Sequence, residues 1–151
     1  MSNNNKIRIA LGSDHAGFTV KKHIIDELLK KQGYNFTDFG TNSEDSVDYP
    51  DFVHPVAQGI GDGSFDYGIV VCNSGNGVNM TVNKYPSVRS ALCWIPEIAE
   101  LARLHNNANV IALPGKFLSY DEALIIAEIF LNTGFEGGRH ERRVNKICSH
   151  S

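Results

Sequence analysis

The stretch YGIVVCNSGNG, residues 67–77, joins an apolar run to a loop that is rich in glycine. A continuous apolar run indicates a strand that is buried on both faces, which is typical of a parallel sheet covered by helices. The loop matches neither common nucleotide fingerprint, because Val78-Asn79 stands where a P-loop has its Lys-Ser/Thr pair, and Met80 stands where a dinucleotide turn has its third glycine. The stretch therefore predicts backbone donors for an anion directly after a cysteine, Cys72.

Four more apolar segments resemble strands, and helical patterns separate them. The expected strands are 7–12, 34–40, 67–72, 88–94 and 109–114. We also expect Cys93 and Trp94, at the end of the fourth strand, to lie in the core. Alternation of buried strands and helices predicts an α/β fold with a five-stranded parallel sheet that is covered on both faces.

The segments between the strands carry helix signals. Apolar residues of 18–33 recur on one helical face, with Gly33 as the expected stop. Ser119 and Glu122 have the spacing of a capping box. The expected helices are 18–33, a helix from the acidic loop 41–51 to about residue 61, one after residue 77, 96–106, 119–133 and a short one in the tail 137–151.

The composition indicates an ordinary globular protein. A chain of 151 residues suits one domain, residues 1–151, and the polar residues 1–5 are expected to form a flexible N-terminus. The net charge of −3, without a basic stripe, argues against nucleic-acid binding. Three widely spaced cysteines without a CxxC pattern favour reduced thiols over disulfides or a zinc site. No segment looks like a signal peptide or a membrane span, so we expect a cytoplasmic protein.

Reactive side chains follow two of the expected strands. Ligands of open parallel sheets bind beyond the carboxyl ends of the strands, so Asp14, His15 and Cys72 should share one rim. A thiol at the start of a helix favours the thiolate, which serves as a base or a nucleophile. The alternatives are a core role for Cys72 and a helix cap for Asp14. His105 ends its helix near the opposite rim, unless another subunit brings it to this one.

The tail contains two arginines, Arg139 and Arg143, at the spacing that puts both on one face of a helix. Two convergent guanidinium groups suit a phosphate, and the alternative is a solvated basic helix end. Together with Lys116 and His15, they indicate a phosphorylated metabolite as ligand. A thiolate and a histidine then allow two chemistries: proton abstraction beside a carbonyl through an enediolate, or nucleophilic attack as in a thiol hydrolase. Sequence spacing leaves both open.

Four motifs in register carry a family resemblance: GSDHAGF, CNSGNG, RLHNNANV and EGGRHERRV. The chain resembles the ribose-5-phosphate isomerase B family, which includes the galactose-6-phosphate isomerase subunits, over about residues 6–148. The resemblance implies a Rossmann-like three-layer sandwich, no metal or organic cofactor, and a homodimer or homotetramer with shared active sites. It also implies interconversion of ribose 5-phosphate and ribulose 5-phosphate in the non-oxidative pentose phosphate pathway. Alternatives are an isomerase of allose 6-phosphate or galactose 6-phosphate, and a non-catalytic sugar-phosphate sensor.

The resemblance also implies roles for individual residues. Cys72 corresponds to the base that moves a proton between C2 and C1, and Ser74 to a hydroxyl near the reacting oxygens. His105 corresponds to a histidine that assists ring opening from the partner subunit, beside Asn106. The remaining positions implied to contact substrate are Asp14 and Tyr49 at the sugar, Asn73, Gly75, Asn76 and Gly77 in the anion-binding loop, and His15, Lys116, Arg139 and Arg143 at the phosphate.

Three positions depart from the family pattern. Asn73 replaces a common glycine, and Lys116 replaces a common arginine and so loses a bidentate fork. Val78 stands where one branch has a glutamate base, which implies that Cys72 is the base in this chain.

Overall fold

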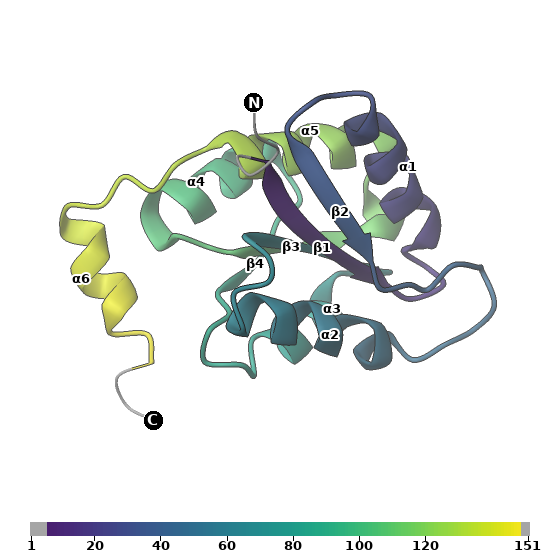
Figure 1. Cartoon of the computed structure of the whole chain (residues 1–151), viewed down its shortest axis with the longest axis horizontal. Coiled ribbons are helices and arrows are strands. Elements are labelled where there is room, and N and C mark those ends of the chain that lie inside the picture. Colours follow the sequence, from purple (N-terminus) through teal and green to yellow (C-terminus); the bar gives the residue numbers. More distant parts are fainter. Residues whose placement is uncertain (1–5, 149–151) are drawn as a thin grey trace.

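The computed structural model describes residues 6–148, so the expected flexible segment 1–5 and the last three residues lie outside the described part. Five parallel strands form one sheet in the order β2-β1-β3-β5-β4 (Figure 1). The strands are β1 Ile7–Ser13, β2 Tyr34–Asp38, β3 Tyr67–Cys72, β4 Ser90–Leu92 and β5 Val110–Pro114. This arrangement confirms the predicted α/β fold with a five-stranded parallel sheet.

Helices cover both faces of the sheet, which makes a three-layer sandwich (Figure 1). One face packs against α1, α4 and α5, and the other packs against α2 and α3. The helix bounds are α1 Phe18–Leu29, α2 Tyr49–Gly61, α3 Asn76–Val82, α4 Pro96–Asn106, α5 Tyr120–Asn132 and α6 Arg139–Asn145, with a short 3₁₀ helix η2 at Gly115–Phe117. The last helix, α6, stands apart from the sheet and contacts α4.

The local signals for α5 act as the sequence predicts. The Ser119 hydroxyl accepts a hydrogen bond from the Glu122 N–H at 3.1 Å, and the Glu122 carboxylate accepts one from the Ser119 N–H at 2.8 Å. This reciprocal capping box satisfies two N–H groups that the first helical turn leaves without partners.

Some details of the elements differ from the sequence predictions. The first helix ends at Leu29 rather than near Gly33, because Leu28 is its last buried residue and the polar residues 30–32 have no core to face. The fourth strand is shorter than expected and covers Ser90–Leu92. The prediction that Trp94 lies in the core was wrong, because the chain leaves the edge of the sheet before Trp94, whose side chain is 52% exposed.

The order of the strands has a reversal between β1 and β3. The chain goes from β1 to β2 on one side and then crosses to β3 on the other side. In open α/β sheets a ligand-binding crevice forms beyond the carboxyl ends of the strands at such a reversal. Here those ends carry Asp14 and Cys72. Among residues 6–148, no helix combines the length and the apolar character that crossing a bilayer requires.

Candidate active site

Cys72 is the last residue of β3, and its side chain is only 5% exposed. The loop after it crosses closely over the end of β5. A Cβ atom at Gly75 would lie 2.5 Å from Leu92 Cδ1 and 3.1 Å from the backbone of Leu113, and the φ angle of Gly75 is +78°. Glycine is therefore required at this position, because other residues would clash and rarely adopt this backbone conformation. The tight turn fixes the thiol beside the start of α3.

The loop presents backbone N–H groups near the thiol. The Asn76 N–H donates to the Ser74 hydroxyl at 3.2 Å, and the first hydrogen bond of α3 runs from Asn79 N to Gly75 O. Within the described part of the chain, the N–H groups of Ser74, Gly75 and Gly77 have no acceptor. Unpaired N–H groups at the start of a helix attract an anion. This geometry agrees with the predicted anion-binding loop.

Asp14 and His15 lie beside the end of β3. The Asp14 N–H donates to Val71 O at 3.3 Å, and the buried Asp14 carboxylate accepts the Gly17 N–H at 3.0 Å. Gly17 is the N-cap residue of α1, so Asp14 organises the turn before the helix rather than capping it directly. His15 Nδ1 accepts a hydrogen bond from the Val47 N–H at 3.1 Å, which leaves Nε2 as a donor in the neutral imidazole.

Tyr49 and Lys116 complete the same rim. Tyr49 begins α2, and its ring lies so close to Gly77 that a Cβ atom there would be 2.4 Å from Tyr49 Cζ. Lys116 lies in η2, where its N–H donates to Asn73 O at 3.0 Å and ties this segment to the Cys72 loop. Asp14 and His15 thus lie on one rim with the Cys72 loop, as the strand rule predicts, and Tyr49 and Lys116 lie beside the same loop.

Lys21 supports this rim from within the core. Its side chain is fully buried, and Nζ donates to Asp38 Oδ1 at 2.5 Å and to Thr41 O at 2.7 Å. Thr41 N in turn donates to Ser13 O at 2.8 Å, at the end of β1. Burial lowers the pKa of the Lys21 ammonium group, and the hydrogen bond and charge of Asp38 oppose this shift. Lys21 therefore holds the segment after β2, and Thr41 of this segment is in turn bonded to the end of β1, directly before Asp14.

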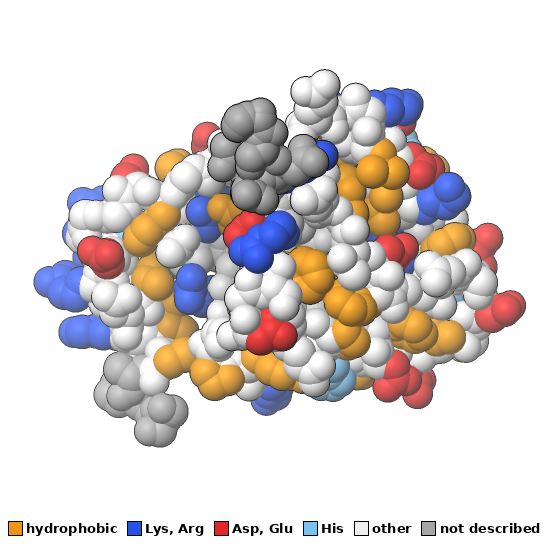
Figure 2. All heavy atoms as spheres, viewed as in Figure 1, with side chains coloured by type: hydrophobic (Ala, Val, Ile, Leu, Met, Phe, Trp, Pro, Cys, Tyr) orange, Lys and Arg blue, Asp and Glu red, His pale blue; other side chains and the backbone are white. Residues whose placement is uncertain are grey.

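The other predicted site residues lie elsewhere in this chain. His105 and Asn106 end α4, at the amino-terminal edge of the sheet, and Arg139 and Arg143 belong to α6. In Figure 1 the strands point toward the right of the view, whereas α6 lies at the left. Figure 2 shows basic side chains gathered over this left end. The expectation that His105 lies near the opposite rim is confirmed. One chain alone does not bring these four residues to the rim around Cys72.

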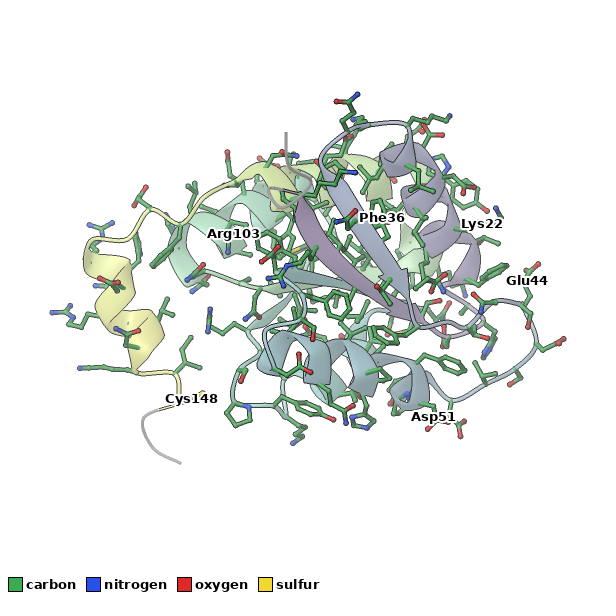
Figure 3. The ribbon with its side chains drawn as sticks, in the orientation of Figure 1. Lys22, Phe36, Glu44, Asp51, Arg103 and Cys148 are labelled. Atoms are coloured by element: carbon green, nitrogen blue, oxygen red, sulfur yellow. The ribbon has the colours of Figure 1, made fainter. Side chains whose placement is uncertain are left out.

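A cleft of about 780 Å³ separates the tail from the body of the protein. Asn106 lines it together with the start of β4 on one side and Ile147 and Cys148 on the other. Figure 3 places Cys148 just beyond α6 and Glu44 at the far end of the molecule, on the loop after β2. The cleft is therefore distinct from the rim around Cys72.

Cys93 provides a contrast with Cys72. It is fully buried in the core, as predicted, and burial raises the pKa of its thiol to about 12. A thiol of this kind stays protonated and inert near neutral pH. Of the three cysteines, Cys72 is the one that borders the rim.

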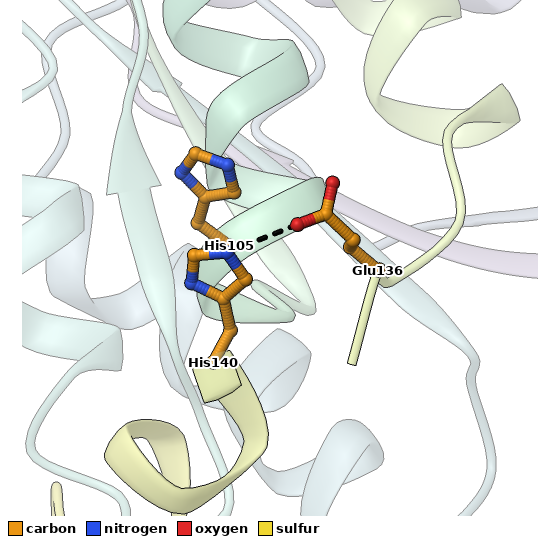
Figure 4. A group of neighbouring side chains, drawn as sticks. All are labelled: His105, Glu136 and His140. Carbon is orange, nitrogen blue, oxygen red and sulfur yellow. Dashed lines mark ion pairs between the residues drawn. The ribbon is translucent and has the colours of Figure 1, made fainter. Parts of the chain in front are cut away.

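Sequence reasoning missed two residues beside His105. Figure 4 shows Glu136 and His140 grouped with His105, and the two histidine rings are stacked with their centroids 4.1 Å apart. Glu136 and His140 have an i, i+4 spacing, but Glu136 precedes α6, so no helical pattern joins them. Their proximity to His105 depends on how the segment before α6 packs against α4.

Comparison with known proteins gives consistent matches. Residues 9–147 match the Ribose/Galactose Isomerase family. The chain is 36% identical to the ribose-5-phosphate isomerase B of Escherichia coli, over 94% of this chain and 95% of that protein. Its structure superposes with a TM-score of 0.91 on a ribose 5-phosphate isomerase of Thermotoga maritima, at 45% identity, covering 95% and 98% of the two chains.

A third match includes a bound sugar phosphate. The ribose-5-phosphate isomerase B of Mycoplasma genitalium with bound ribulose-5-phosphate superposes with a TM-score of 0.89, at 42% identity and with 95% of each chain covered. These matches extend over nearly the whole fold, including the rim around Cys72. The chain belongs to the Ribose/Galactose Isomerase family.

Proposed function

We propose that this protein is a ribose-5-phosphate isomerase of the B type, which interconverts ribose 5-phosphate and ribulose 5-phosphate. The main support is the near-complete match to the Mycoplasma genitalium enzyme with ribulose-5-phosphate, at 42% identity. The rim around Cys72 supports the same activity, because it combines a thiol, a carboxylate, a histidine and unpaired N–H groups.

The proposed mechanism uses Cys72 as a base. The thiolate removes the proton from C2 of the open-chain aldose, and an enediolate forms as the C1 oxygen takes up negative charge. The N–H groups of the 73–77 loop stabilise that charge, and the Ser74 hydroxyl lies beside the reacting oxygens. The Cys72 thiol exchanges its proton with water while the enediolate persists, and it then gives a proton to C1 while the proton of the C2 hydroxyl moves to O1, which gives the ketose. Val78 is buried and apolar, so it offers no competing base in the loop.

We propose that the active site is completed by a second copy of the chain. His105 and Asn106 would reach the partner's rim to open the sugar ring, and Arg139 and Arg143 would bind the phosphate together with His15. Lys116 would add charge there without a bidentate fork. The separation of these residues from Cys72 within one chain supports this arrangement. A homodimer is the smallest assembly that brings these residues together, and a tetramer built from two such dimers also does so.

The proposed location is the cytoplasm, and the proposed reaction needs no cofactor. Among the described residues Cys72, Cys93 and Cys148 form no disulfide, which is the usual state of cysteines in a reducing compartment. Proton transfer through an enediolate is complete with the protein's own acid and base groups.

The substrate is tested by comparing kcat/KM for ribose 5-phosphate, allose 6-phosphate and galactose 6-phosphate. The proposal predicts the highest value for ribose 5-phosphate. A higher value for a six-carbon sugar phosphate would assign the protein to another isomerase activity of the same family. Turnover of none of the three would refute the aldose–ketose isomerase proposal.

The shared site is tested by mixing two variants, Cys72→Ala and His105→Asn, each expected to be inactive alone. After subunit exchange, about half of the dimers are mixed, and each mixed dimer has one intact site, so about a quarter of the wild-type activity should return. Mixed dimers that form without any return of activity would show that each chain supplies its own His105.

A further inference from the structure

The group of His105, Glu136 and His140 lies outside the rim around Cys72. One potential ligand atom of each residue lies within 4.8 Å of those of the other two. The histidine rings are nearly parallel, at 12°, and His140 Nε2 lies 3.0 Å from Glu136 Oε1 (Figure 4). Two imidazoles and a carboxylate form a donor set that is typical of zinc sites with three protein ligands.

Backbone hydrogen bonds hold the three residues in place. The Glu136 N–H donates to Leu104 O at 3.0 Å, in the last turn of α4, and the His140 N–H donates to Gly137 O at 3.1 Å. The Arg103 Nε–H donates to Thr133 O at 2.9 Å and ties the same connecting segment to α4. The segment that carries Glu136 is therefore fixed to the end of α4, which carries His105, before any ligand binds.

The histidine of α6 has an unsatisfied polar atom. The His140 side chain is 9% exposed, and its Nε2 atom makes no hydrogen bond of acceptable geometry with any residue that the structure describes, although Glu136 is close. A buried polar atom without a partner is costly, and ligation to a metal satisfies it. Glu136 is half exposed and His105 is partly exposed, which leaves a path for an ion to enter.

Neighbouring charges have opposite effects on a cation. The group lies at the carboxyl end of α4, where the helix dipole favours positive charge. On α6, Glu141 also favours a cation, whereas Arg139, Arg142 and Arg143 oppose it. These four side chains are exposed, so water and salt screen their contributions.

We propose that His105, Glu136 and His140 bind a zinc ion, with water as the fourth ligand. In tetrahedral zinc sites the bonds are about 2.1 Å long, so ligand atoms lie about 3.4 Å apart. Side-chain rotations that move each ligand atom by about 1 Å bring the three atoms from within 4.8 Å to about 3.4 Å of one another. These rotations also turn the two imidazole rings out of their stack. Three dispersed ligands of this kind leave no spacing motif in the sequence.

The consequence for activity rests on the proposed function. A zinc ion on His105 occupies the nitrogen lone pair that proton transfer in ring opening requires, and it holds the ring against α6. Zinc should therefore inhibit the isomerase, and a chelator should restore activity. Such a site makes the enzyme sensitive to free zinc without making it a zinc enzyme.

Binding is tested by isothermal titration of the full chain with Zn²⁺, in a Cys148→Ser background that removes an exposed thiol ligand. We expect one ion per chain, with affinity reduced about tenfold or more by Glu136→Gln and by His140→Gln. Two matched controls, Glu141→Gln and His23→Gln, remove the same types of group elsewhere and should leave the affinity unchanged. Because Glu136 is half exposed, its variant is expected to fold even if the His140 variant does not.

Equal zinc affinity in all variants, or no binding at all, would overturn the proposal. A parallel activity assay compares zinc inhibition of the Cys148→Ser protein with that of its Glu136→Gln variant, and the variant should resist inhibition. Failure of the proposed function is distinguishable: titration then still shows the site, but no turnover of ribose 5-phosphate occurs even without zinc. Isomerase activity that zinc leaves unchanged, despite binding at this site, would refute the inhibitory consequence alone.

Discussion

Gly77 offers a sharp test of the role of Tyr49, because the tyrosine ring lies directly against it. In Gly77→Ala the new Cβ atom would lie 2.4 Å from Tyr49 Cζ and 2.8 Å from its hydroxyl oxygen. Ordinary contacts of this kind begin at 3.4 Å, so the ring must retreat by about 1 Å. Tyr49 is 37% exposed, which gives the ring room to move toward solvent.

The expected effect is small on stability and large on activity. Overpacking costs about 1–3 kcal/mol, and alanine is favoured over glycine within a helix by about 0.5–1 kcal/mol. The net destabilisation of Gly77→Ala should therefore be about 1 kcal/mol. Displacement of a substrate-positioning group by about 1 Å reduces the rate by about a hundredfold. We expect that loss in kcat/KM for ribose 5-phosphate.

Urea unfolding and steady-state kinetics measure the two effects. Gly134→Ala is the matched control, because no atom lies within 4 Å of its new Cβ, and it should change neither quantity appreciably. In a Tyr49→Ala background the substitution at Gly77 has nothing to displace and should add no further loss of activity. Full, additive losses in the double variant, or normal activity of Gly77→Ala, would refute the role assigned to Tyr49.

Three further predictions concern phosphate binding, the core and pH. Arg143→Ala should raise KM for ribose 5-phosphate more than it lowers kcat, and an unchanged KM removes this arginine from the phosphate site. Lys21→Met should lower the free energy of unfolding by about 2 kcal/mol in urea titrations, because it leaves the buried Thr41 carbonyl and the partly buried Asp38 carboxylate without the Nζ donor. The exposed Lys22→Met should change it by less than about 0.5 kcal/mol, and equal stability of the two variants contradicts the packing argument. The hydrogen bond and charge of Arg8 lower the pKa of Asp66 below 3.8, so this pair stabilises the fold above that pH and loses its effect as pH falls through the folded-state pKa. Asp66→Asn should thus be less stable than wild type at about pH 6 and equally stable at about pH 2, and a difference that is constant with pH argues against the ion pair.

The central strands and the rim around Cys72 were predictable from the sequence. Strands β3 and β5 and residues 9–12 of β1 are mostly buried on both faces and are apolar in sequence, and the carboxyl ends of these parallel strands meet at one edge. The placement of Asp14, His15 and Cys72 together follows from that rule. The order of the strands was not predictable in the same way, because it depends on which helices pack on which face.

The positions that the sequence did not predict depend on tertiary contacts. The exposure of Trp94 follows from the early end of an edge strand, which local composition does not indicate. The grouping of Glu136 and His140 with His105 depends on hydrogen bonds between α4 and the segment before α6. Such bonds join residues that are distant in sequence, so no periodic pattern marks them.

In the proposed mechanism Cys72 is the base of an enediolate isomerisation. Proton NMR of ribose 5-phosphate with the protein in heavy water tests it directly, beside Cys72→Ala, a substitution small enough to preserve the fold at this buried position. Ribulose 5-phosphate that carries deuterium at C1 should form with the wild-type protein and should be absent with the variant. Ketose formation that persists in Cys72→Ala, or that proceeds without any deuterium incorporation, would contradict it.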